Sequence, residues 1–257
     1  MPPVMKTSGF REATGRARIT LSKTRAAYIG PGLDLTPHRN VAVTVALALH
    51  SPFELEFLGG GAGDVVLGHV ALIPSGALHH LRASGDMMFL YLDALSDDHK
   101  QLKTSDLASA HARLLREHGD AVWTQDVDQL CELLGVPAHR VGDARIAEVV
   151  RRIDEAPQAF VRVADAAGLA GVSASHFQSL FRRSVGVPFR RYRLWRRMAA
   201  VMRALSNGET LTGAALEAGF SGSAHLSATF RTMFGLTPST LIALGARIEV
   251  AQTERRN

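Results

Sequence analysis

The chain contains 257 residues, which is enough for two domains of ordinary size. Hydrophobic residues make up 46% of it, yet no apolar run reaches the roughly 18 residues that a membrane-spanning helix needs, so we expect no membrane partner. The first residues lack the basic start and the apolar core of a secretory signal, and a single cysteine, Cys131, cannot form an intrachain disulfide. These features together predict a cytoplasmic protein.

Positive charge is concentrated in the second half of the chain. Residues 143–257 contain 16 Lys and Arg against 9 Asp and Glu, whereas residues 1–142 contain 13 against 15. Eight arginines and no acidic residue occur from Arg182 to Arg203. Such a run is typical of a surface that binds a polyanion, although a charge run taken alone is about as often a solvated helix face.

Short strands are predicted in the first half. Residues up to about 25 are basic and lack apolar periodicity, which indicates a loose arm or a first edge strand. Beyond residue 40, β-rich stretches alternate with turns that contain glycine and proline, a spacing that predicts a small barrel or sandwich. The stretches cover residues 41–49, 53–58, 64–73 and 87–92.

Helical periodicity replaces the strands after residue 97. Residues 97–118 and 126–134 carry apolar side chains at helical spacing, and we expect two helices beside the barrel. These helices either pair two copies of the chain as a homodimer or cover an edge of the barrel. Proline and glycine in residues 135–142 indicate a connection, so we predict one domain over residues 1–140 and a second over residues 141–257.

The second domain contains one pattern twice. An Ala-rich stretch, a glycine, a serine and a pair of large apolar residues occur in residues 164–186 and recur 48 residues later, with one extra residue in the second copy. Each Ala-rich helix is predicted to end at Gly171 or Gly219, because glycine adopts a left-handed cap without strain. Ser173 and Ser221 then stand where the N-cap of a following helix is expected.

The helix that follows the serine has a predicted buried side in each copy. Phe177 and Phe181 form it in the first unit, and Leu226 and Phe230 form it in the second. The remaining side chains then face outward, as in the helix of a helix-turn-helix that enters a major groove. The arginine-rich stretch 189–205 also has helical periodicity, and we predict a connecting helix about 25 Å long.

These residues resemble the AraC/XylS family of bacterial transcription regulators over about residues 143–245. The most specific portion is Glu217-Ala218-Gly219-Phe220-Ser221, followed by His225-Leu226, Phe230-Arg231 and Phe234-Gly235-Leu236-Thr237-Pro238-Ser239. The resemblance implies an all-α domain of two helix-turn-helix units joined by a linker helix, with double-stranded DNA as its partner. The bases would be read by Ser175, His176, Gln178, Ser179, Ser223, Ala224, Ser227 and Ala228.

Phosphate contacts are expected beside these base-reading residues. In many relatives one or more of these outward positions holds arginine or another long polar side chain. Ser179 and Ala228 are short here, so bidentate reading of guanine is not evident. Gln178 is the best candidate for reading adenine, and methyl contacts, water and DNA shape would supply further specificity. The predicted phosphate contacts are Ser173, Arg182, Arg183, Arg190, Ser221 and Arg231.

A second resemblance lies in the first half, where Gly68, Pro74, Gly76 and His79 have the spacing of the second motif of cupin barrels. The regulator family often carries such a barrel as its effector-sensing part. The resemblance therefore implies an α+β chain of two domains, with a cupin-like N-terminal β-barrel, a small-molecule effector and His79 as a candidate effector residue. The bland interpretation of His79-His80 is a strand pair with one ring inward and hydrogen-bonded and one ring outward.

Metal chemistry has little support in the sequence. Catalytic cupins combine a His-x-His pair and a carboxylate with the later histidine, and no His-x-His lies upstream of His79. Cys131 lies on a predicted helix without a defined base partner, and no nucleophile elbow occurs. We therefore predict no metal, no cofactor and no catalytic residue.

Three functions remain open. The favoured one is a sequence-specific regulator that a small molecule modulates, and RNA polymerase would be a further partner if the protein is an activator. The second is a cupin-type metalloenzyme with an accessory DNA-binding module, motivated by the motif from Gly68 to His79. The third is an architectural protein that coats DNA with little preference, motivated by the arginines and the short base-reading side chains.

Overall fold

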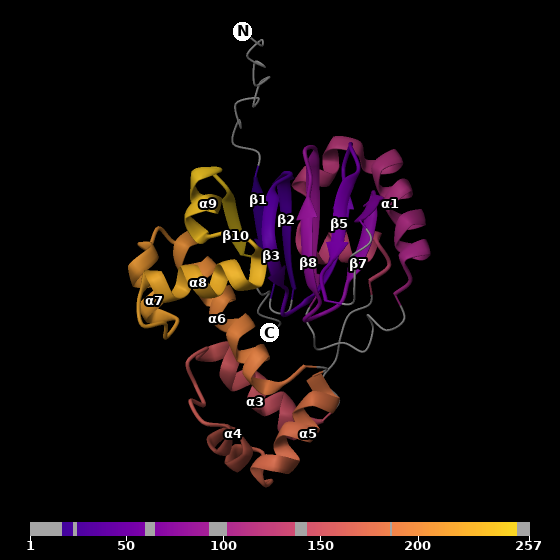
Figure 1. Cartoon of the computed structure of the whole chain (residues 1–257). Coiled ribbons are helices and arrows are strands. Elements are labelled where there is room, and N and C mark those ends of the chain that lie inside the picture. Colours follow the sequence, from indigo (N-terminus) through magenta and orange to yellow (C-terminus); the bar gives the residue numbers. More distant parts are fainter. Residues whose placement is uncertain are drawn as a thin grey trace, which may run out of the picture.

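The computed structural model describes residues 17–22, 25–59, 65–92, 102–136, 143–185 and 187–250. A sheet-rich N-terminal part is followed by a helical C-terminal part, which confirms the predicted α+β architecture at this level (Figure 1). The domain boundary predicted after residue 140 lies outside the described residues. None of the described helices combines the length and the hydropathy that crossing a bilayer requires.

The described strands form two sheets. The larger sheet has the order β10-β1-β2-β9-β4-β7, and the smaller has the order β3-β8-β5-β6. The strands are β1 (Arg18–Leu21), β2 (Arg25–Pro31), β3 (Asp34–Arg39), β4 (Val43–Ala48), β5 (Phe53–Phe57), β6 (Val65–Gly68), β7 (Val70–Ile73), β8 (Leu78–Arg82), β9 (Asp86–Leu92) and β10 (Arg247–Val250).

The predicted barrel is not closed. Among the described strands no ladder joins the two sheets: β6 pairs with β5 in the smaller sheet, and β7 pairs with β4 in the larger one. The cupin-like motif residues Gly68 and His79 thus belong to the smaller sheet, whereas β7 between them pairs with β4 in the larger one. The N-terminal half is therefore a pair of packed sheets.

The central strand β4 shows why the larger sheet is buried on both faces. All six of its residues are buried. Val45 and Leu47 point into the core under the flanking helices, whereas Ala46 and Ala48 belong to the core between the two sheets. A continuous apolar run of this kind is expected for a strand that is covered on both sides.

Two helices cover the outer face of the larger sheet. They are α1 (Thr104–His118) and α2 (Val127–Leu133), joined by the 3-10 helix η2 (Gly119–Thr124). Leu107, Leu114 and Leu130 of these helices pack against strands β2, β4 and β9 in one apolar core. The side chain of Asp126 accepts hydrogen bonds from the first amides of α2 and begins that helix.

Helices of the C-terminal part form two groups joined by the longest helix, α6. The first group has its own apolar core and lies away from the sheets, whereas the second shares a core with them (Figure 1). The helices are α3 (Ala144–Glu155), α4 (Val163–Leu169), α5 (Ala174–Val185), α6 (Phe189–Ser206), α7 (Leu211–Glu217), α8 (Ser223–Phe234) and α9 (Pro238–Ala243).

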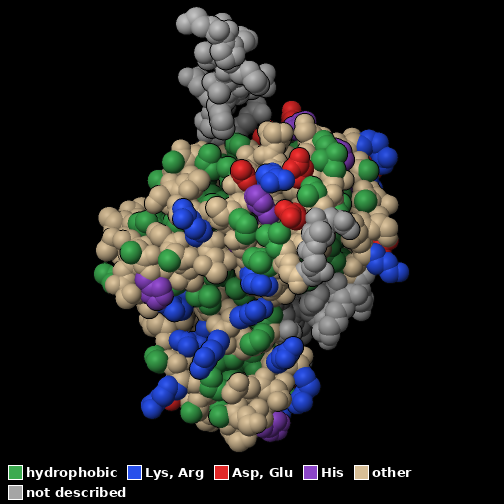
Figure 2. Space-filling view, in the orientation of Figure 1, with side chains coloured by type: hydrophobic (Ala, Val, Ile, Leu, Met, Phe, Trp, Pro, Cys, Tyr) green, Lys and Arg blue, Asp and Glu red, His purple; other side chains and the backbone are tan. Residues whose placement is uncertain are grey.

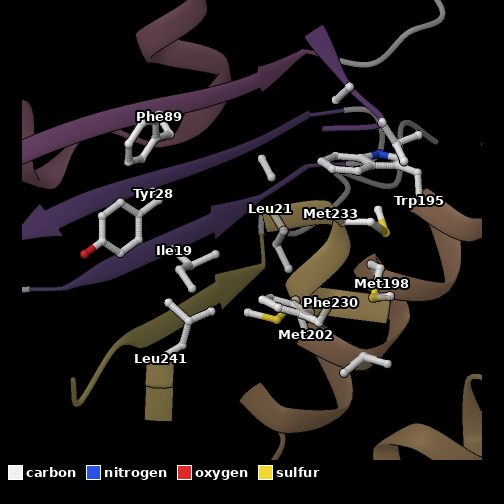
Figure 3. Packing of buried hydrophobic residues seen from close by; sticks show 14 of the residues in the cluster. Ile19, Leu21, Tyr28, Phe89, Trp195, Met198, Met202, Phe230, Met233 and Leu241 are labelled. Atoms are coloured by element: carbon white, nitrogen blue, oxygen red, sulfur yellow. The ribbon is translucent and has the colours of Figure 1, made fainter. Parts of the chain in front are cut away.

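The second group is joined to the N-terminal half by packing and by a strand. Trp195 and Met202 of α6 and Phe230 of α8 lie against the inner face of the larger sheet (Figure 3). Strand β10 pairs in parallel with β1 and forms the edge of that sheet. The guanidinium of Arg18 pairs with the carboxylate of Glu249 at 2.5 Å across these two strands. The first strand is therefore not an edge strand, because the end of the helical part covers it.

Candidate nucleic-acid interface

The turn between α4 and α5 has the predicted geometry. Gly171 adopts φ 66°, and the amide of Val172 donates to the carbonyl of Ala167 at 3.1 Å, as in a Schellman motif. Ser173 then begins α5, because its Oγ accepts a hydrogen bond from the amide of His176 at 3.3 Å. The glycine end and the serine start expected for this unit are both confirmed.

The turn between α7 and α8 matches the expectation only at its glycine. Gly219 adopts φ 80°, and the amide of Phe220 donates to a carbonyl of α7 at 2.8 Å. Ser221, however, is not the N-cap: that position belongs to Gly222, and the Oγ of Ser221 instead lies 3.1 Å from Nδ1 of His225. The extra residue in this turn moves the serine one position away from the helix.

Large apolar side chains hold the second helix of each unit in place. Phe177 and Phe181 of α5 are fully buried, and each packs edge-on against Phe189 of α6 with ring centroids 5.1 Å apart. Leu226 and Phe230 of α8 are likewise buried. The predicted anchors are confirmed, and they orient the opposite face of each helix toward solvent.

The predicted DNA contacts lie on these outward faces. Each α5 residue in the base-reading set is exposed, whereas in α8 only the alanines are exposed and the two serines are half-buried. The predicted phosphate contacts are all exposed, and two of them continue the α5 face toward its C-terminal end. The exposed residues are Ser175, His176, Gln178, Ser179, Ala224 and Ala228 for bases, and Ser173, Arg182, Arg183, Arg190, Ser221 and Arg231 for phosphates.

Two arginines of the run, Arg196 and Arg197, make contacts inside the protein that stabilise the fold. The side chain of Arg196 is only 2% exposed and forms an ion pair of 2.8 Å with Asp154 of α3. Arg197 lies 3.9 Å from the ring centroid of Phe220 and donates to the carbonyl of Ala218. The predicted polyanion footprint is therefore smaller than eight arginines, because α6 is enclosed by both helix groups.

Burial also affects the pKa of three arginines of α6. Loss of solvent lowers the pKa of Arg193, Arg197 and Arg203, since burial disfavours the charged form. Asp154 is the acidic partner of this arginine run that the sequence did not reveal. It lies 42 residues before Arg196, at a spacing that carries no motif, and the hydroxyl of Tyr192 also donates to it at 3.3 Å.

His79 and His80 are placed as expected for a strand pair with one ring inward and one ring outward. The ring of His79 is buried, lies against the ring of His38 with centroids 4.2 Å apart, and has Nδ1 3.0 Å from the carbonyl of Ala77. The ring of His80 points outward and has Nε2 2.9 Å from a carboxylate oxygen of Asp34. Burial lowers the pKa of His79 and brings that of His38 to about 4, so both rings are neutral at pH 7.

The described residues contain no group of three or more histidines, cysteines and acids that could hold a metal ion. Cys131 is buried beneath the larger sheet, and burial raises the pKa of its thiol to about 12. Its thiol is therefore protonated at neutral pH, which gives it the packing role of a small apolar side chain.

A cavity of about 70 Å³ lies between the larger sheet and the C-terminal helices. Its lining combines strand residues with residues of α6, α8 and α9, and His79 does not belong to it (Figure 3). Sequence reasoning did not find this cavity, because its wall comes from segments far apart in the chain. The described lining residues carry no charge and include Ile19, Leu21, Tyr28, Phe89, Trp195, Met198, Ala199, Met202, Phe230 and Leu241.

Comparison with known proteins supports a DNA-binding role. Residues 166–243 match a family described as a helix-turn-helix domain. A comparison with curated protein sequences gives no match.

Solved structures of ToxT from Vibrio cholerae share the fold of both halves. A 1.65 Å structure of ToxT is 13% identical, with a TM-score of 0.50 over 86% of this chain and 98% of that one. The unsaturated fatty acid-bound form of ToxT is 12% identical, with a TM-score of 0.53 over 86% of this chain and 95% of that one. ToxT bound to (E)-4-(8-methylnaphthalen-1-yl)but-3-enoic acid is 13% identical, with a TM-score of 0.51 over 86% of this chain and 99% of that one. The chain carries a helix-turn-helix domain of the AraC type in its C-terminal part, and this domain together with the shared fold supports a DNA-binding transcription regulator.

Proposed function

We propose that the protein is a sequence-specific transcription regulator that reads double-stranded DNA with α5 and α8. The observation that carries this proposal is that both helices lie within the matched helix-turn-helix region and present a solvent-facing side opposite their buried anchors. Helix α6 has 18 residues and spans about 27 Å, a scale close to the roughly 34 Å between successive major grooves. One chain would thus read two neighbouring grooves.

The two reading helices would contribute differently. Gln178 is exposed on α5 and is long enough to pair with an adenine edge, with Arg182 one turn further along to contact the backbone. The exposed base-reading residues predicted on α8, by contrast, are small: Ala224 and Ala228 can contact thymine methyl groups and can fit the groove, but their side chains cannot donate hydrogen bonds. We therefore expect the stronger base preference at the box that α5 reads.

Selection of random duplex DNA by the full-length protein at physiological salt tests this proposal. We expect two short enriched boxes about one helical turn apart. The control variant is Gln158→Ala, which removes an exposed glutamine outside α5 and should leave the enriched boxes unchanged. Selection without any enriched sequence, together with equal affinity for unrelated duplexes, would favour the architectural alternative.

The effector site is proposed to be the cavity between the two halves rather than the surroundings of His79. Its wall is apolar and includes Met198 of α6 and Phe230 of α8, so a ligand there would contact both the linker helix and the second reading helix. A ligand that binds one arrangement of these helices better than another would shift the arrangement presented to DNA. The bound acids of the ToxT structures support an apolar chain as the ligand class.

Calorimetric titration of the protein with an unsaturated fatty acid tests this site. We expect saturable binding that Ala199→Phe abolishes, because the added ring fills the cavity that Ala199 lines. Thermal unfolding of this variant shows whether its fold is retained. The control is Ala112→Phe on the exposed side of α1, which should leave binding unchanged. Equal binding to all three proteins would place the ligand elsewhere.

A homodimer and a contact with RNA polymerase belong to the same proposal. The apolar face of α1 packs on the larger sheet through Leu107 and Leu114, which supports the covering role of this helix. The described residues on its outward face are exposed and mostly polar, and this face is the one that a second copy of the chain would contact. Light scattering at several protein concentrations measures whether two chains pair, and transcription from the selected site distinguishes activation from repression. Such a regulator would act in the cytoplasm, where its DNA lies.

A further inference from the structure

Two arginines from different halves of the chain meet at one turn. Arg39 ends β3, and its Nη1 donates to the carbonyl of Gly76 at 2.7 Å. Arg191 of α6 reaches the same glycine from the other side, since a Cβ built on Gly76 would lie 2.7 Å from its Nη1. Gly76 has φ 79°, a left-handed conformation that favours glycine, and the absence of a Cβ leaves room for the guanidinium of Arg191.

The part of the chain that the structure describes offers neither guanidinium an acidic partner. Among the described residues, no carboxylate lies within ion-pair distance of Arg39 or Arg191, and both side chains belong to exposed residues. Two arginines elsewhere in the N-terminal half have acidic partners: Arg82 lies 2.8 Å from Glu54, and Arg18 pairs with Glu249. Two unpaired positive charges held against one turn repel each other, and a bound anion would relieve that repulsion.

The position of this pair connects it to the reading helices. Strand β3 contacts the end of α8, where the amide of Thr36 donates to the carbonyl of Gly235 at 3.0 Å. The other end of β3 carries Arg39, which bonds the turn at Gly76 that Arg191 also approaches. Arg191 lies in the first turn of α6, and α6 begins shortly after the end of α5 in the sequence. Figure 2 shows Lys and Arg side chains gathering over α6 and α5, below the sheets. The arginine pair therefore extends the basic surface of the helical part onto the N-terminal sheet.

We propose that Arg39 and Arg191 together bind a phosphate group of the DNA backbone, so that the N-terminal half contributes directly to the DNA-binding surface. The proposal rests on the DNA-binding function proposed above. Guanidinium groups suit this role, because their planar set of donors matches the oxygens of a phosphate. DNA is preferred to a small anion because the site is open and adjoins Arg190, which is also exposed at the start of α6.

The salt dependence of DNA affinity tests the proposal in the full-length protein on its selected duplex. Each lost phosphate contact should reduce the slope of log affinity against log salt by about 0.9, which is about fivefold in affinity at 0.15 M salt. We expect this change for Arg39→Gln, for Arg191→Gln and, without further loss, for the double variant. Arg39→Lys should retain the salt slope because it keeps the positive charge. If Arg39 acted only through its hydrogen bond to Gly76, Arg39→Lys and Arg39→Gln would instead have the same salt slope. Arg82→Gln is the matched control and should change nothing.

The outcomes separate this inference from the proposed function. If the unmodified protein selects a sequence but Arg39→Gln keeps its salt slope, the phosphate contact is wrong and the regulator remains. If the unmodified protein binds no duplex, both fall together. A titration with inorganic phosphate adds a third arm: binding that depends on Arg39, with an unchanged DNA slope, would show that the site takes a free anion and would overturn the DNA assignment.

Discussion

Replacing Asp154 with asparagine should uncouple the first helix group from α6. The carboxylate of Asp154 forms an ion pair of 2.8 Å with Arg196, whose side chain is 2% exposed, and it accepts a hydrogen bond from Tyr192. Breaking a buried ion pair from one side typically costs 3–5 kcal/mol, because the remaining charge stays buried without compensation. The side chain of Asp154 is itself 25% exposed, so water offsets part of that cost and we expect the lower end, about 3 kcal/mol.

The free energy of unfolding, measured with urea at pH 7, checks this expectation. Glu155→Gln is the control, since that carboxylate is exposed and pairs with Arg151 on the surface of the same helix, where little stability is lost. A second variant, Asp154→Leu with Arg196→Met, should recover most of the loss because it removes both charges at once. Equal stability of Asp154→Asn and the unmodified protein would refute the reasoning.

Three further changes have defined outcomes. Gln178→Ala should relax the preference at one base pair of the selected site and cost about 1 to 3 kcal/mol in binding to the best sequence; an unchanged selected motif would remove Gln178 from base reading. Arg231→Ala should weaken binding to all duplexes alike and flatten the salt dependence, and a changed motif would instead assign it a base contact. Acidification should destabilise the fold through His38, whose folded-state pKa of about 4 lies below its ordinary value of 6.5. The unfolded chain then binds more protons, so this stability is present above pH 6.5 and is lost as the pH falls toward 4. Urea unfolding between pH 7 and pH 5 measures the loss, and His38→Gln should reduce its pH dependence.

Local features of the helical part were predictable because their signals lie close together in the sequence. Gly171 and Gly219 end their helices as expected, since a left-handed residue is required within a few positions of the turn. The spacing of Phe177 and Phe181 also identified the buried side of α5. Ser221 failed as an N-cap for a local reason: one inserted residue moved the cap to Gly222, and alignment of the two copies gave that insertion no position within the turn.

Features that depend on contacts between residues far apart in the chain could not be predicted from the sequence. The pairing of the strands determines whether the sheets close into a barrel. The alternation of residues within β6 and β7 does not reveal that pairing, because it is the same for a barrel and for two sheets. The role of Arg196 depends on Asp154, and the cavity depends on side chains from both halves. Charge counting treated every arginine of α6 alike, whereas packing divides them into buried and exposed ones.

The pairing of β10 with β1 has a consequence for how the chain is made. Strand β1 is synthesised before the other described strands and its neighbour β10 after them, and Arg18 and Glu249, whose side chains pair, are 231 positions apart in the sequence. During translation the backbone edge of β1 therefore stays uncovered until the reading helices have left the ribosome, and such edges invite pairing with other chains. Production of residues 1–140 alone would leave that edge permanently open, so aggregation of the isolated half is the expected result.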